Sequence, residues 1–120
     1  PSEISGGMQK RVAIARAIVN NPKYLFCDEP NSGLDPKTAI VIDELIQEIT
    51  HEYNITTVIN THDMNSVLQI GEHICFLKDG KLVWEGTSKE IMVTDNEDIV
   101  DFVYSSELLR EIRRFHSGKK

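Results

Sequence analysis

Residues 24–36 read YLFCDEPNSGLDP, and this stretch decides the fold. It begins with a run of four apolar residues, Tyr24–Cys27, a pattern typical of a strand that is buried on both faces. Two acidic residues and a proline then end the strand. Asp35-Pro36 is typical of a helix N-cap that is followed by proline at the first helical position. The stretch therefore predicts a buried strand, a loop that begins with Asp28-Glu29 (the acidic loop) and the start of a helix.

The flanking segments extend this alternation of helices and strands. Upstream, apolar residues recur at helical spacing between Met8 and Val19. Downstream, the β-branched run from Thr56 to Thr61 predicts a second inner strand, and a short helix follows it as far as Ile70. Helix–strand–helix–strand–helix with short links favours parallel strands joined by crossover helices. The fold class is therefore α/β.

The segment HICFLKDGKLVWEG, residues 73–86, predicts an antiparallel hairpin at the edge of this sheet, because Asp-Gly between two apolar runs favours a tight turn. From about Ser88 the remaining residues predict amphipathic C-terminal helices. Two parallel strands do not make a stable sheet alone, so we expect neighbouring strands to be missing or borrowed from another chain. The chain also starts in mid-motif at Pro1, which indicates a fragment.

Composition narrows the class of protein. A chain of 120 residues is one domain at most, and its formal charge of −6 argues against nucleic-acid binding. No apolar run approaches the ~18 residues of a membrane span. Cys27 and Cys75 each lie in an apolar stretch, which predicts buried thiols in a reducing compartment rather than a disulfide.

Two short motifs suggest phosphate chemistry. Ser5-Gly6-Gly7 precedes a helix, where backbone amides and the helix dipole make an anion site; taken alone, the triplet is more typical of a plain helix cap with flexible glycines. Asp28-Glu29 follows the first strand at its carboxyl end, where α/β sheets place ligands. One acid could hold Mg²⁺ while the next polarises an attacking water, or both could be merely solvated.

His62 follows the second strand in the same way, and could contact a γ-phosphate or orient water. A structural role for a lone histidine is the alternative. The role of Asp35 is also open, because helix capping alone would explain an aspartate at this position.

The order of these motifs resembles the ATPase subunits of ABC transporters. Ile4–Met8 resembles the signature motif, Tyr24–Glu29 the Walker B strand, Ser32–Asp35 the D-loop and His62 the switch histidine. The resemblance covers residues 1–93, with residues 94–120 as a C-terminal helical extension. It implies a partial P-loop NTPase (RecA-like) core. The sequence has no GxxxxGK[ST] loop, so the resemblance implies the carboxyl-terminal portion of such a subunit.

The resemblance also implies the cofactors ATP and Mg²⁺ and a role for each motif residue. Asp28 would assist Mg²⁺ binding, Glu29 would be the general base, and His62 would contact the γ-phosphate. Asp35 would couple the two sites of a head-to-tail dimer.

The signature residues would act on a partner subunit. Ser5, Gly6 and Gly7 would hold the γ-phosphate bound by the Walker A motif of the second ATPase subunit. Met8 departs from the commoner glutamine and loses a polar contact there. The other expected partners are transmembrane permease subunits, at the cytoplasmic face of the inner membrane.

A finer resemblance links SGGM, DEPNSGLDP and THDM to Mla-type phospholipid transport ATPases, with a generic importer ATPase as the next choice. A soluble ABC-type ATPase of DNA repair or the ribosome, and a stand-alone module that supplies the signature in trans, are the alternatives to a transporter. For the 120 residues alone we expect no ATPase activity and self-association through uncovered sheet edges.

Overall fold

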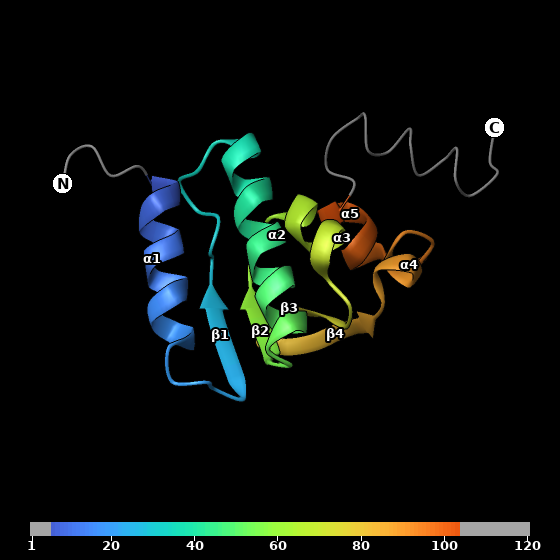
Figure 1. Ribbon diagram of the computed structural model, residues 1–120. Coiled ribbons are helices and arrows are strands. Elements are labelled where there is room, and N and C mark those ends of the chain that lie inside the picture. Colours follow the sequence, from blue (N-terminus) through green and yellow to red (C-terminus); the bar gives the residue numbers. More distant parts are fainter. Residues whose placement is uncertain (1–5, 104–120) are drawn as a thin grey trace. The chain divides into compact units, whose positions relative to one another are not determined.

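The computed structural model describes residues 6–103, which form two compact units that divide between Ile70 and Gly71 (Figure 1). The first unit alternates helices and strands, as the sequence predicts. Its elements are α1 (Gly6–Ile18), β1 (Tyr24–Asp28), α2 (Pro36–Glu52), β2 (Thr56–Asn60) and α3 (Met64–Ile70).

The two strands of this unit are parallel, and α2 is the crossover between them. Asp28 pairs with Asn60 in the register, so both strands end at the same edge of the sheet. α1 and α2 begin at the end of the unit toward which β1 points (Figure 1). The parallel crossover and the α/β fold class are thus confirmed. The carboxyl ends of the strands and the start of α2 bring the acidic loop and the D-loop residues to one end of the unit.

The boundaries of α2 follow from its sequence. Asp35 has extended backbone angles and caps the helix by accepting a hydrogen bond from the Thr38 amide, and Pro36 takes the first helical position. At the other end Asn54 has φ +52°, a left-handed conformation that asparagine tolerates. The chain therefore turns sharply from α2 into β2.

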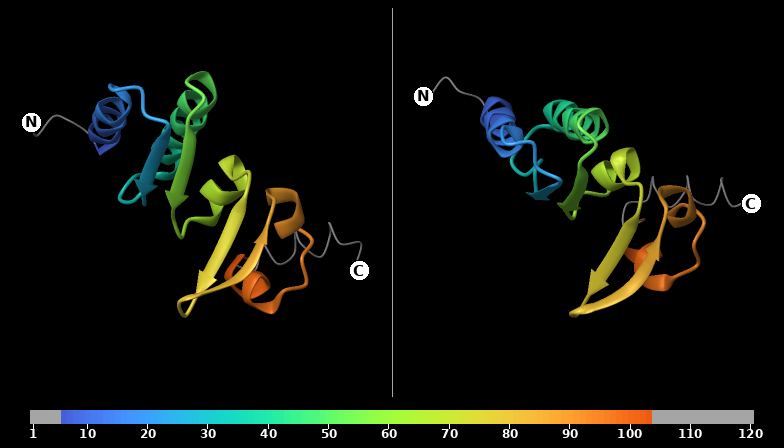
Figure 2. Two further views of the ribbon diagram at one scale, coloured as in Figure 1. Left: turned by 90° about the horizontal axis from the view of Figure 1, so that it is seen from below. Right: turned by 60° about the horizontal axis from the view of Figure 1, so that its bottom comes forward.

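The core of the first unit lies between the sheet and the helices α1 and α2, which cover one face of it (Figure 2). Its buried members come from both helices, from β1 and from the residue before β2: Ile14, Leu25, Ile42, Ile46, Ile49 and Ile55. On the other face Tyr24 is 61%, Phe26 74% and Val58 49% exposed. The prediction of a strand buried on both faces is therefore wrong, because nothing in the described part of the chain packs on this second face.

The second unit begins with the predicted hairpin, β3 (Ile74–Lys78) and β4 (Lys81–Gly86). Asp79 and Gly80 have φ +52° and +75°, as a tight two-residue hairpin turn requires. Within residues 6–103, the hairpin makes a two-stranded sheet of its own. The antiparallel hairpin predicted from the sequence is thus confirmed.

The amphipathic region predicted from about Ser88 forms two short helices, α4 (Ser88–Ile91) and α5 (Glu97–Val103). Thr87 and Glu90 form a reciprocal capping box that fixes the start of α4. Ile91, Ile99 and Val103 are buried, and the rings of Phe76 and Phe102 lie 5.1 Å apart. The rest of the expected extension, after Val103, lies outside the described residues. None of the helices within residues 6–103 combines the length and hydropathy of a membrane span.

The two cysteines differ in their surroundings. Cys27 is half-buried on β1, and burial raises the pKa of its thiol. Cys75 is exposed, because successive side chains of β3 point to opposite faces and Cys75 shares the open face with Glu85. Both are free thiols, as predicted, but the expected burial of Cys75 is wrong.

Candidate functional site

The acidic pair predicted from the sequence lies at the carboxyl end of β1. Asn60 donates from Nδ2 to Oδ1 of Asp28 at 2.8 Å, and the Glu29 amide donates to the carbonyl of Asn60 at 2.7 Å. Glu29 has φ +47°, so the chain turns abruptly at this residue. These hydrogen bonds join the ends of the two strands. The two neighbouring carboxylates point to different partners: Asp28 faces Asn60, whereas Glu29 faces the residues after β2.

Glu29 and His62 form the centre of the site. His62 Nδ1 lies 2.8 Å from Glu29 Oε2, and the Thr61 hydroxyl donates to Oε1 over a longer 3.5 Å. The hydrogen bond and negative charge of Glu29 raise the pKa of His62 above its ordinary value. The side chain of His62 is 81% exposed and that of Glu29 33%. The structure thus brings together an acid and a histidine at a place that a solvent-borne ligand can reach.

Asp35 stands at the start of α2, and both oxygens of its carboxylate accept hydrogen bonds from Thr38. Oδ2 accepts from the Thr38 amide at 3.1 Å and Oδ1 from the Thr38 hydroxyl at 2.7 Å, and these bonds lower the pKa of Asp35. The capping explanation from the sequence is therefore confirmed. A second role across a dimer stays a prediction.

The glycines of the signature motif open α1. Gly7 is buried, whereas Gly6 is exposed and lies against the D-loop residues. A Cβ added to Gly6 would come within 2.9 Å of Cδ2 of Leu34. Met8 is 51% exposed, and Ser5 lies outside the described residues. The N-terminus of α1 and the Ser32–Asp35 turn are thus neighbours in one chain.

A buried polar cluster, which the sequence patterns do not predict, supports the acidic loop. Asn31, two residues after Glu29, donates from Nδ2 to Asp43 Oδ1 at 2.5 Å and to Ser66 Oγ at 2.6 Å. All three side chains are buried, and Oδ1 of Asn31 has no hydrogen-bond partner within residues 6–103. The cluster therefore connects the loop after β1 with α2 and α3.

Little in the sequence could have revealed this cluster, because its members lie 12 and 35 residues apart along the chain. Asn60 was also missed, although a signal for it exists. Aligning the predicted parallel strands by their polar ends places Asn60 beside Asp28, as the register shows.

Comparison with known proteins gives the same family as the motifs. A family model described as "ABC transporter" matches residues 1–32. The methionine import ATP-binding protein MetN of Latilactobacillus sakei is 41% identical over 109 residues, which cover 91% of this chain and 32% of that protein. MetN 1 of Oceanobacillus iheyensis is 42% identical over 106 residues, covering 88% and 31%.

Solved structures agree with this result. A dimeric structure of the ATP-binding cassette MJ0796, in a post-hydrolysis state with ADP and Pi, matches with a TM-score of 0.62 and 43% identity, over 73% of this chain and 38% of that one. The chain thus spans about a third of the length of the relatives named above. Motif order, relatives and fold together show that this chain has the α/β fold of ABC ATP-binding cassettes and matches a part of one.

Proposed function

We propose that the protein to which this chain belongs hydrolyses ATP to drive transport, and that the chain supplies four of its motifs. The observation that carries this proposal is the 2.8 Å contact between Glu29 and His62 at the carboxyl end of two parallel strands. This edge is where open α/β sheets bind nucleotides and other ligands. The 41% identity to an ATP-binding import protein supports the same activity.

Glu29 is the proposed general base. Its Oε2 is occupied by His62, whereas the longer 3.5 Å contact of Thr61 leaves Oε1 able to accept a proton from an attacking water. His62 is proposed to contact the γ-phosphate. Because Glu29 raises the pKa of His62, the ring is more often protonated near neutral pH and can donate to a phosphate oxygen.

Asp28 is the proposed metal residue, and its surroundings suit that role. Oδ1 accepts from Asn60, while Oδ2 has no hydrogen-bond partner among residues 6–103, so an exposed carboxylate oxygen is left for a hard cation. Mg²⁺, when bound with ATP, supplies charge neutralisation at the phosphate oxygens. Asn60 would hold the Asp28 carboxylate in a fixed orientation toward the cation.

The proposed site is shared between two ATPase subunits arranged head to tail. Ser5, Gly6 and Gly7 would offer amide and hydroxyl donors to the γ-phosphate on the second subunit, with Met8 beside them, and Asp35 would couple the two sites. The dimeric cassette among the similar structures supports this assembly. Since these 120 residues contain no P-loop, we expect no ATP turnover by the chain alone.

The proposed partners outside the ATPase pair are transmembrane permease subunits, with the protein peripheral at the cytoplasmic face of the membrane. The relatives named above are methionine importers, so we propose import of methionine or a solute of that kind. The phospholipid substrate suggested by the sequence finds no support among them.

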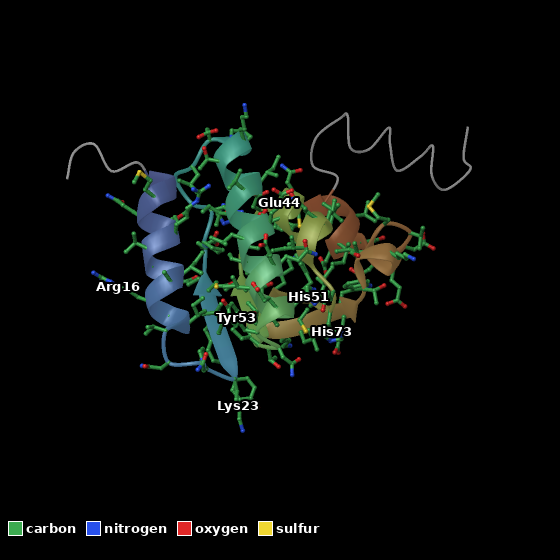
Figure 3. The ribbon with its side chains drawn as sticks, in the orientation of Figure 1. Arg16, Lys23, Glu44, His51, Tyr53 and His73 are labelled. Carbon is green, nitrogen blue, oxygen red and sulfur yellow. The ribbon has the colours of Figure 1, made fainter. Side chains whose placement is uncertain are left out.

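The test is the substitution Glu29→Gln in the full-length protein, with Glu44→Gln on the exposed surface of α2 as the matched control (Figure 3). Loss of a general base lowers turnover by about 10²–10⁴-fold, and we expect ATP affinity to stay within about threefold. Glu44→Gln is expected to keep normal turnover. Full turnover by Glu29→Gln would remove Glu29 from the proposed role.

A further inference from the structure

Three side chains that commonly bind metals converge on the β3–β4 hairpin, away from the residues of the proposed nucleotide site in sequence. His73, Cys75 and Glu85 each offer one donor atom, and these atoms all lie within 4.8 Å of one another. His73 Nε2 and Glu85 Oε2 are 2.6 Å apart. All three residues are exposed, and His73 is labelled beside the hairpin in Figure 3.

The hairpin backbone creates this cluster. Cys75 and Glu85 are direct partners in the antiparallel register, so their side chains leave the same face of the sheet. His73 lies just before β3, and its contact with Glu85 places its ring beside that face. The next pair, Phe76 and Trp84, points to the opposite face.

We propose that His73, Cys75 and Glu85 bind a zinc-like divalent cation. A thiolate, an imidazole and a carboxylate are all zinc ligands, at about 2.0–2.3 Å from the metal. Tetrahedral geometry with those bond lengths separates the donors by about 3.3–3.8 Å. The 2.6 Å pair must widen by less than about 1 Å, which exposed side chains achieve by small rotations.

The donor set also decides which cations fit. Mg²⁺ and Ca²⁺ prefer oxygen ligands, whereas a thiolate together with an imidazole favours Zn²⁺ and its neighbours in the first transition row. Three protein ligands leave the fourth position to water or to a group from a partner. The bound cation would cross-link β3 to β4 and stabilise the hairpin, with a gain that rises with the logarithm of the free cation concentration above Kd.

An exposed His73–Glu85 ion pair is the competing explanation of the short contact, and it gives Cys75 no role. Titration of the 120-residue chain with Co²⁺, in the absence of oxygen, separates the two. We expect the near-ultraviolet charge-transfer absorption of a cobalt–thiolate bond, and its displacement by Zn²⁺. That band is expected to disappear in Cys75→Ser and to persist in Cys27→Ser, because burial disfavours the Cys27 thiolate.

The other two ligands are tested by Zn²⁺ affinity. We expect His73→Gln and Glu85→Gln each to weaken binding at least about tenfold, and the exposed-histidine control His51→Gln on α2 to leave it unchanged. Far-ultraviolet circular dichroism of each variant checks that it folds. Absence of the cobalt–thiolate band, its survival in Cys75→Ser, or unchanged affinity in both ligand variants would overturn the proposal.

Discussion

Removal of the Asn31 side chain should destabilise the first unit far more than an exposed asparagine would. In Asn31→Ala the carboxylate of Asp43 and the hydroxyl of Ser66 lose a donor while they remain 2% and 3% exposed. A hydrogen bond to a charged group contributes about 1.5–3 kcal/mol and a neutral one about 0.5–1.5 kcal/mol. The expected loss in the free energy of unfolding is therefore about 2–4.5 kcal/mol, a large part of the ~5 kcal/mol of a small domain.

The assay is urea denaturation followed by far-ultraviolet circular dichroism, a signal to which α1 and α2 contribute strongly. Asn65→Ala, at an exposed position of α3, is the matched control and should change stability by less than about 0.5 kcal/mol. A double-mutant cycle with Asp43→Ala should give a coupling energy of about 1 kcal/mol or more. A loss below about 0.5 kcal/mol for Asn31→Ala, or no coupling, would refute the assignment of this cluster as a support of the acidic loop.

Two further predictions concern the site and the open face of the sheet. Because Glu29 raises the pKa of His62, Glu29→Gln should lower it toward about 6.5 in a nuclear magnetic resonance titration. Because the pKa of His62 is raised in the folded state, the Glu29–His62 pair stabilises the fold below about pH 6.5 and loses this effect as the pH rises through the folded pKa. The stability difference between wild type and Glu29→Gln should therefore shrink with rising pH. An unchanged His62 titration in Glu29→Gln would contradict the assignment of the raised pKa to Glu29. Phe26 is 74% exposed on the open face of the sheet, and we expect this face to take part in self-association together with the sheet edges. Phe26→Asp should therefore reduce self-association in sedimentation without loss of helicity, whereas Leu25→Asp should unfold the unit. Equal self-association of wild type and Phe26→Asp would contradict the part expected of this face.

Local patterns predicted the order of elements well because each depends on nearby residues. The apolar run after Lys23, the cap and proline at Asp35-Pro36, and the Asp79-Gly80 turn all predicted elements that the structure contains. The contact between Glu29 and His62 could also be predicted from the sequence, because both residues follow the carboxyl ends of parallel strands.

Burial could not be read from the same patterns, because it depends on what packs against an element. Phe26 and Cys75 lie in apolar runs, yet both are exposed: one face of each two-stranded sheet has no covering layer in the described part of the chain. The burial of Asn31 could not be predicted for a similar reason. An asparagine in a loop predicts a turn, and only its distant partners on α2 and α3 make it a buried support.

Calorimetry with Mg-ATP tests most directly the central claim, that this chain holds one part of a shared nucleotide site. The chain is titrated alone and then as a mixture with a P-loop-containing amino-terminal half of the domain. We predict no binding by the chain alone and tighter binding by the mixture than by the amino-terminal half alone. Tight binding by the chain alone, or no gain from mixing, would contradict the shared site.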